Sequence, residues 1–352
     1  MSGKVIGVDL GTKRVKYYRK GDGIVFDQEN CIAIENQNEI RAIGDEAAVM
    51  YGRTPATINV IYPVVRGVIA DVSAMELYFN TSFRDIYGGK TRRAYGSNFV
   101  IALPTDITEV EKRAFPDLIM KSDIKPKNIS LVDKPICVAL AAGIEIMNAK
   151  GIMTVDIGAD TTEIAVISLG GIVTSELLPI AGNKFDKSII SYIREQCGLV
   201  IGKANAEELK KGIGGALSGK TLTMPVNGRD AYTGLPKRIE ISSDMIYEAL
   251  KGDLANITED IKSILERVAP EISSDIIDTG IYVTGGSAQI ADLDVLFGEA
   301  TKLKINILAN PQDSVITGLG KLIDDENYMV LPYIYRQPGY YIKSANKNAK
   351  KN

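Results

Sequence analysis

The chain has 352 residues, of which 45% are hydrophobic and 24% charged, with a formal net charge of −3. Its composition is typical of a globular protein, and its length predicts two lobes rather than one core. The negative charge argues against a nucleic-acid-binding protein, and the absence of histidine excludes histidine-based acid–base catalysis and histidine-ligated metals. Three separated cysteines predict no disulfide framework and indicate a reducing cytoplasm.

The first part of the chain alternates short apolar runs with glycine-rich turns. These runs predict two hairpins, at 5–8 with 15–18 and at 24–26 with 31–34. Thr108 is placed to start a helix with two glutamates in its first turn, and Pro116 should kink or end it. The other elements expected before residue 150 are helices at 46–51, 75–83 and 135–146 and strands at 99–103 and 129–132.

Residues 87–97 form a basic, glycine-rich segment that also carries Tyr87 and Tyr95. Two interpretations are open for this loop. It is either a solvated connection or a surface for anionic lipid or a partner protein.

Two strand–turn–strand segments carry the strongest chemical signal. An apolar strand runs into Asp9, Gly11 and Thr12, and a later strand at 152–155 runs into Asp156 and a small-residue turn. Such turns direct backbone N–H groups and hydroxyls at a phosphate chain, and their carboxylates can hold Mg²⁺ through water. Their repetition indicates two related domains that close on one nucleotide.

The second half of the chain adds more strands, several helices and a small β-rich insertion. Expected elements are strands at 163–168, 172–176 and 281–283, helices capped by Asn183 and by Ser242 or Ser243, helices at 206–211 and 257–268, and the insertion at 212–240. Glycine-rich turns follow at 284–287 and 317–320. The basic stretch 343–352 is too polar to pack and is expected to be disordered, either solvated or in contact with acidic protein or lipid head groups.

Longer stretches of the sequence resemble the MreB family, the bacterial actins of the actin-like ATPase superfamily. The resemblance runs from about residue 4 to 324, and its matching stretches are 52–55, 67–71, 107–113, 162–173, 234–237, 239–243 and 284–286. It implies an α/β, actin-like ATPase fold of two lobes, built from duplicated RNase H-like domains with a nucleotide cleft between them. The implied first lobe is 1–145 with 325–352, with a subdomain inserted at about 32–66. The implied second lobe is 146–324, with a subdomain inserted at about 182–250.

The resemblance also implies which residues hold ATP or ADP with Mg²⁺. The implied residues are Asp9, Gly11 and Thr12, followed by Lys13 and Arg14, on the first phosphate loop; Asp156, Gly158, Thr161 and Thr162 on the second; Glu207 and Lys210 at the ribose and base; and Gly285, Gly286 and Ser287 at the adenosine. Asp9 and Asp156 are the implied magnesium residues, acting through water. The implied partners are further copies of the chain, in head-to-tail protofilaments that often pair antiparallel on the inner membrane surface.

The chain departs from the family pattern at its catalytic positions. Lys134 stands where the family has the glutamate that positions the attacking water, and Ala159 and Asp160 replace two glycines of the second phosphate loop. Lys13 and Arg14 replace an alanine and an asparagine of the first loop. We expect Lys134 and Asp160 to pair across the site beside Thr161, so that ATP binds but is hydrolysed slowly. The alternative is that another residue positions the water and hydrolysis is normal.

Three functions remain open from the sequence. The first is an ATP-binding filament protein for cell shape or motility, with weak hydrolysis; the second is a fully active ATPase or kinase of the superfamily; the third is a scaffold that holds nucleotide without polymerising. For the filament protein we expect a cytoplasmic location at the inner face of the membrane, reached through the 87–97 loop or the basic tail. A paralogue with an intact catalytic site is a further expected partner, and nucleic acid is not.

Overall fold

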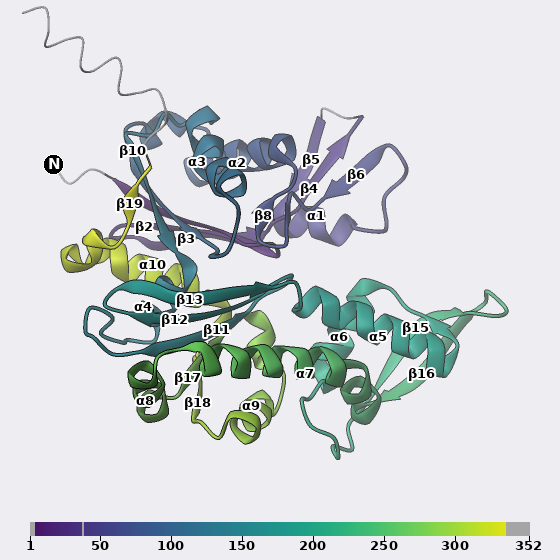
Figure 1. Cartoon of the computed structure of the whole chain (residues 1–352). Helices are drawn as coiled ribbons and strands as arrows, with labels where there is room; N and C mark the ends of the chain where they lie inside the picture. The colour runs from purple at the N-terminus through teal and green to yellow at the C-terminus, as the bar shows by residue number, and fades with distance from the viewer. Residues whose placement is uncertain (1–3, 37–38, 336–352) are drawn as a thin grey trace, which may run out of the picture.

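The computed structural model describes residues 4–36 and 39–335. The predicted tail at 343–352 therefore lies outside the described residues. Two large sheets dominate the molecule, one above the other in Figure 1, and smaller insertions extend from both toward the same end.

The two large sheets repeat one topology. The first has the order β19-β10-β9-β1-β2-β3 and the second the order β13-β12-β11-β17-β18. In each, an antiparallel hairpin (β1 with β2, β11 with β12) continues through one parallel strand (β9 or β17) to another (β10 or β18). Their bounds are β1 Val5–Leu10, β2 Arg14–Arg19, β3 Gly23–Glu29, β9 Asn98–Leu103, β10 Asn128–Asp133, β19 Tyr333–Ile334, β11 Ile152–Ile157, β12 Thr162–Ser168, β13 Gly171–Leu178, β17 Ile281–Thr284 and β18 Ile305–Ile307. This duplication confirms the predicted two-lobed α/β fold.

One predicted strand pairing is wrong. The hairpin expected between 24–26 and 31–34 does not form, because β3 pairs with β2 across the Gly21-Asp22-Gly23 turn. The following strand, β4 (Ile32–Glu35), leaves this sheet and pairs with β5 (Glu39–Ile43) and β6 (Ile58–Ile61). With α1 (Gly44–Met50), these strands form the insertion of the first lobe, and the short hairpin of β7 (Val64–Val65) and β8 (Val68–Ile69) follows it.

The insertion of the second lobe comprises two helices and a three-stranded sheet. Its elements are α5 Gly182–Cys197, β14 Leu199–Val200, α6 Lys203–Ile213, β15 Thr223–Asp230 and β16 Pro236–Ser242. Asn183 does not cap α5 as predicted, because α5 begins at Gly182 and the Asn183 side chain is used elsewhere. Ser242 does cap the next helix, α7 (Ser243–Arg267), by accepting the Met245 N–H. α7 joins the helix predicted after this cap with the one predicted at 257–268.

Outer helices cover the far face of each sheet. Those of the first lobe are α2 (Val72–Ile86) and α3 (Glu109–Lys121), and those of the second include α7, α8 (Pro270–Thr279) and α9 (Leu293–Thr301). Thr108 starts α3 with a complete capping box with Glu111, as its sequence predicts. The helix continues through Pro116 to Lys121, so the proline does not end it.

A pair of helices, α4 (Lys134–Ala141) and α10 (Ser314–Asp324), packs between the two sheets, and its apolar residues share one core with both. The helices touch backbone to backbone, since a Cβ at Gly318 would lie 1.7 Å from the Cys137 carbonyl oxygen. A Cβ at Gly7 of β1 would likewise meet the Leu319 side chain of α10. α10 lies before the boundary predicted at residue 324 and packs on the first sheet as well as the second.

Candidate functional site

A cavity of about 570 Å³ opens between the two lobes, at the carboxyl ends of β1 and β11. Asp9 and Asp156 occupy equivalent places at the ends of these strands. Of the residues predicted to hold nucleotide, those that line the cavity are Asp9, Gly11, Thr12, Lys13, Arg14, Asp156, Gly158, Thr161, Glu207, Lys210, Gly285, Gly286 and Ser287. The structure thus brings together four segments that are far apart in the sequence.

The two phosphate loops have the same turn. The Gly11 N–H donates to the Arg14 carbonyl and the Gly158 N–H donates to the Thr161 carbonyl, each at 2.9 Å. A Cβ at Gly11 would lie 2.8 Å from the Arg14 oxygen, so a side chain there would disrupt the turn. The same hydrogen-bonded turn is therefore present in both loops that are expected to hold phosphate.

Thr162 is not a lining residue of the cavity. Its side chain is fully buried, and its hydroxyl donates to the Ile180 carbonyl at 2.6 Å. Thr162 therefore fixes the second loop from behind, and Thr161 is the threonine that faces the cavity.

The turn at 284–287, where the adenosine is expected, is attached to the second predicted phosphate loop. Gly285 has φ +89°, and a Cβ there would lie 2.3 Å from the Ile157 carbonyl oxygen. The Ser287 hydroxyl donates to the Gly158 carbonyl at 2.9 Å. Only glycine fits at 285, because the two loops meet through their backbones.

The predicted ion pair between Lys134 and Asp160 is wrong. The Lys134 ammonium lies 3.0 Å from an Asp9 carboxylate oxygen, and both side chains are 12% exposed. Lys134 begins α4 directly after β10, and β10 and β1 flank the same strand, β9, so the carboxylate of β1 is its neighbour. Burial lowers the pKa of Lys134, but the charge and hydrogen bond of Asp9 together with the charges of Asp156 and Glu163 outweigh this and hold the pKa above its ordinary value.

Asp160 instead connects the two lobes. It accepts the Arg66 backbone N–H at 3.0 Å from the β7–β8 turn of the first lobe. It also accepts the Asn183 side-chain amide at 2.6 Å, at the start of α5 in the second lobe. The adjacent Gly67 N–H donates to the Thr12 hydroxyl at 3.2 Å, so this turn closes over both phosphate loops.

Lysines occupy the side of the cavity where the ribose and base are expected. The Lys13 ammonium lies 3.2 Å from Glu29 and 3.1 Å from Glu207, which joins the first phosphate loop to α6. Lys210 pairs with Asp186 at 2.6 Å and donates to the Gly182 carbonyl at 2.8 Å. Burial raises the pKa of Glu207, but a hydrogen bond from Lys211 and the charges of Lys13 and Lys211 outweigh it and lower the pKa to about 2.

Arg14 is directed away from the phosphate loop. Its guanidinium pairs with Asp27 of β3 at 2.5 Å and with Asp45 of α1 at 3.3 Å. It therefore joins the first sheet to the insertion of its lobe.

The sequence missed several cavity residues. Glu163 is buried and accepts both the backbone N–H and the hydroxyl of Thr105, at 2.5 and 2.6 Å, across the lobe junction. Burial raises the pKa of Glu163 to about 7 and that of Asp156 to about 6. Lys16 is also buried, with its ammonium 2.5 Å from Asp313. Lys16 lies inside an apolar strand, and no sequence pattern marks such a lysine as a cavity residue. Asn183 also lines the cavity, but its sequence context predicts a helix cap.

No helix among the described residues is long and apolar enough to cross a membrane. Within residues 4–36 and 39–335 there is also no group of three or more Cys, Asp or Glu side chains that could hold a metal ion.

A sequence profile described as MreB/Mbl protein matches residues 3–330. The chain belongs to the MreB/Mbl family. The cell shape-determining protein Mbl of Bacillus cereus is 40% identical over 331 residues, covering 92% of this chain and 97% of that protein. The cell shape-determining protein MreB of Escherichia coli K12 is 34% identical over 325 residues, covering 91% of this chain and 93% of that protein.

Solved structures of this family have the same architecture. MreB5 of Spiroplasma citri bound to AMPPNP superposes with a TM-score of 0.86 at 31% identity, covering 99% of each chain. The same protein bound to ADP gives 0.85 at 31% identity, covering 100% of this chain and 99% of that one. A MamK double helical filament, at 20% identity and a TM-score of 0.76, shares the fold, so the actin-like fold is confirmed.

Proposed function

We propose that this chain is a nucleotide-binding bacterial actin that polymerises into cytoskeletal filaments for cell shape or motility. The observation that carries the proposal is the cavity between the lobes, lined by both Asp–Gly–Thr turns and the adenosine turn. Relatives are named as cell shape-determining proteins, and the S. citri relative was solved with AMPPNP and with ADP. ATP and ADP are accordingly the ligands that we assign to this cavity.

Slow hydrolysis is the second part of the proposal. Its support is that Lys134 is protonated and paired with Asp9, since a charged ammonium cannot accept a proton or a hydrogen bond from the attacking water. Transfer of a phosphoryl group to water depends on orienting that water. Without the glutamate that does this in the family, ATP should persist in the cleft.

A magnesium ion fits the expected site poorly. Asp9, one of its two expected carboxylates, is already paired with Lys134. Mg²⁺ is usually bound by one or two carboxylates together with substrate phosphates, so any ion here depends on the phosphates and on Asp156.

Three measurements on the full chain separate the candidate functions. We expect binding of ADP and AMPPNP, sedimentation of the chain with ATP, and phosphate release at least about tenfold slower than from Escherichia coli MreB, which corresponds to about 1.4 kcal/mol in the barrier. Phosphate release at the rate of that relative would support the fully active ATPase. Binding without sedimentation at any concentration would support the scaffold.

Self-association is expected to join opposite ends of the molecule. One end exposes apolar side chains at the β12–β13 turn and after α10, with Leu169 65% and Val330 71% exposed. The other end is the tip of the β15–β16 hairpin, where Tyr232 is 91% and Leu235 65% exposed. Figure 1 places these segments at the two ends of the long axis. Exposed apolar patches at both ends favour head-to-tail stacking. A paralogue that retains the water-positioning glutamate could enter the same filament and supply hydrolysis.

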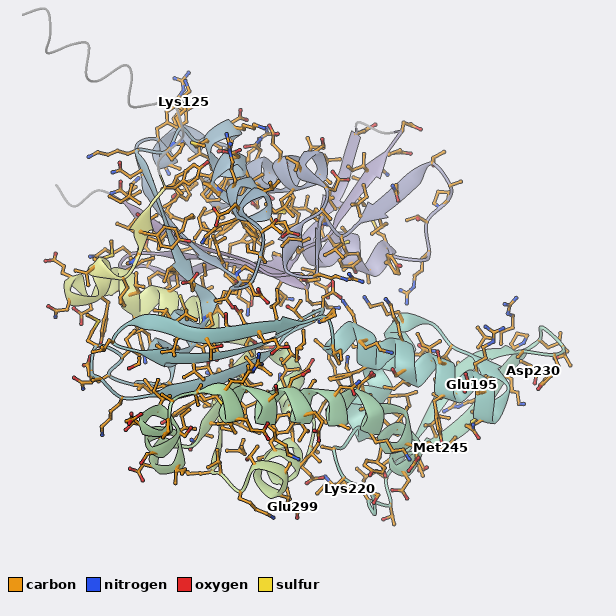
Figure 2. The ribbon with its side chains drawn as sticks, in the orientation of Figure 1. Lys125, Glu195, Lys220, Asp230, Met245 and Glu299 are labelled. Atoms are coloured by element: carbon orange, nitrogen blue, oxygen red, sulfur yellow. The ribbon has the colours of Figure 1, made fainter. Side chains whose placement is uncertain are left out.

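Membrane attachment is proposed through a basic patch. Exposed Lys4, Lys90, Arg92, Arg93 and Lys125 gather around the 87–97 loop, where Lys4 donates to the Arg93 carbonyl and Lys125 lies over the Tyr95 ring. In Figure 2 Lys125 extends into solvent at the edge of the first lobe. Tyr87, which the sequence places in this loop, is buried against Phe83 and is therefore not part of the surface.

The basic patch predicts binding to the anionic inner face of the membrane, at about 1 kcal/mol per basic residue. Vesicles with phosphatidylglycerol should therefore pellet the chain at low salt and release it at high salt. The double variant Arg92→Ala, Arg93→Ala should pellet less, whereas Lys262→Ala on the exposed side of α7 should not change. Salt-insensitive binding to neutral vesicles would contradict the electrostatic attachment.

A further inference from the structure

The Lys134 ammonium lies among several carboxylates of the cleft. Lys134 is the first residue of α4, and its side chain, which is only 12% exposed, lines the cleft. Its ammonium lies 3.0 Å from Asp9, and the charges of Asp156 and Glu163 also act on it. Asp9 is one of the two carboxylates expected to hold a hydrated magnesium ion. The Lys134 ammonium therefore lies beside the position where that ion would bind.

Replacing the family's glutamate by Lys134 changes the charge of the expected magnesium site by as much as one divalent ion would. Asp9, Asp156 and a glutamate at position 134 would together carry three negative charges. Asp9, Asp156 and Lys134 sum to one negative charge, because one ammonium has replaced one carboxylate. The difference is two positive charges, which equals the charge of Mg²⁺.

The ammonium is also chemically suited to this role. A lysine ammonium is compact and offers three N–H donors, and the contact with Asp9 uses only one direction. Donors of this kind can hold phosphate oxygens as a point charge does. A second cation brought beside Lys134 would be repelled at this short distance, particularly in a buried site.

We propose that the Lys134 ammonium takes over the charge-neutralising role of the divalent cation, so that this cleft binds ADP and ATP without Mg²⁺. The inference rests on the proposed nucleotide binding and goes beyond it. It assigns the replacement at position 134 a binding role in addition to the loss of water positioning. It also gives the ion pair of Lys134 with Asp9 a role in nucleotide binding.

The test compares binding constants with and without divalent ions. Fluorescent ADP and fluorescent AMPPNP are titrated with the full chain in excess Mg²⁺ and in excess EDTA. We expect the Kd of the unchanged chain to differ by less than about threefold between the two buffers. In Lys134→Glu, which restores the carboxylate, removal of Mg²⁺ should weaken binding by at least about tenfold.

Two further variants keep the comparison interpretable. Lys262→Glu makes the same charge change on the surface of α7 and should behave like the unchanged chain. Lys134→Gln removes the charge without adding a carboxylate and should gain an intermediate dependence on Mg²⁺. Thermal melts establish that each variant is folded before its Kd is compared.

Each outcome decides the inference. Binding of the unchanged chain that falls by more than about tenfold in EDTA overturns it and leaves the proposed nucleotide binding intact. Equal binding in both buffers for Lys134→Glu overturns the assignment to Lys134. No binding in either buffer overturns the inference together with the proposed function.

Discussion

Asp160 ties the lobes together where the sequence suggested a catalytic ion pair. Its two carboxylate oxygens accept one hydrogen bond from each lobe, from the Arg66 N–H and the Asn183 amide. Asp160 can therefore hold the two lobes together with no nucleotide in the cleft. Closure in this chain should therefore depend less on which nucleotide is bound.

Removing the Asp160 carboxylate should loosen the empty protein. Asp160→Ala leaves the Arg66 and Asn183 donors without their partner, and we expect the free energy of unfolding to fall by about 1–3 kcal/mol. Urea denaturation of the nucleotide-free chain measures this change, with the exposed Asp278→Ala as its matched control. Asn183→Ala combined with Asp160→Ala should cost less than the sum of the two single changes. Additive costs would show that the two side chains act independently.

The residues of the site were predictable where a local pattern fixes them. An apolar strand followed by a small-residue turn can be recognised in the sequence. This local pattern identified Asp9, Gly11, Asp156 and Gly158. The partner of Lys134 was not predictable in this way, because it depends on the order of β10, β9 and β1 in the sheet. The sequence suggested Asp160 as the partner of Lys134, but Asp9 is the carboxylate that contacts Lys134 in the structure.

Elements were predictable for a similar reason. The β1–β2 hairpin and the capped start of α3 follow from contacts between residues that are close in sequence. The pairing of β3 with β4 failed because the chain leaves the sheet after Glu29 to build an insertion, and no short-range signal marks that departure. The contact of α4 with α10 joins helices more than 170 residues apart, and no sequence pattern indicated it. The glycine-rich turn predicted at 317–320 is wrong, because these residues lie inside α10.

The contact between α4 and α10 should be intolerant of one added methyl group. Gly318→Ala would force a Cβ into the Cys137 carbonyl, so the helices must separate, and the free energy of unfolding should fall by about 1–3 kcal/mol or more. Gly252→Ala in α7 is the matched control, because no atom lies within 4 Å of a Cβ there. That control should stabilise the chain by about 0.4–1 kcal/mol. Denaturant midpoints of the two variants that moved in the same direction would contradict the close packing.

At the scale of the whole molecule, the two lobes are joined by short polar contacts and one shared helix pair. Glu163 with Thr105, Lys13 with Glu207 and Asp160 with Arg66 all cross the cleft. The α4–α10 pair lies behind them and packs on both sheets. Because these contacts surround the cavity, nucleotide binding and the relative position of the lobes are mechanically linked. The relative position of the lobes also sets the orientation of the two ends of the molecule, which a filament contact would use.

The end of the molecule beyond α10 therefore provides a test of assembly that is separate from nucleotide binding. Val330→Glu places an unpaired carboxylate on the apolar end, and burying it in a head-to-tail contact would cost well over about 1.4 kcal/mol. We expect the critical concentration for sedimentation with ATP to rise at least about tenfold, with the Kd for ADP unchanged. Val295→Glu makes the same substitution on α9, away from both ends, and should sediment normally. Equal sedimentation of the two variants would place the filament contact elsewhere, since the exposed side chain of Val330 would then remain in solvent.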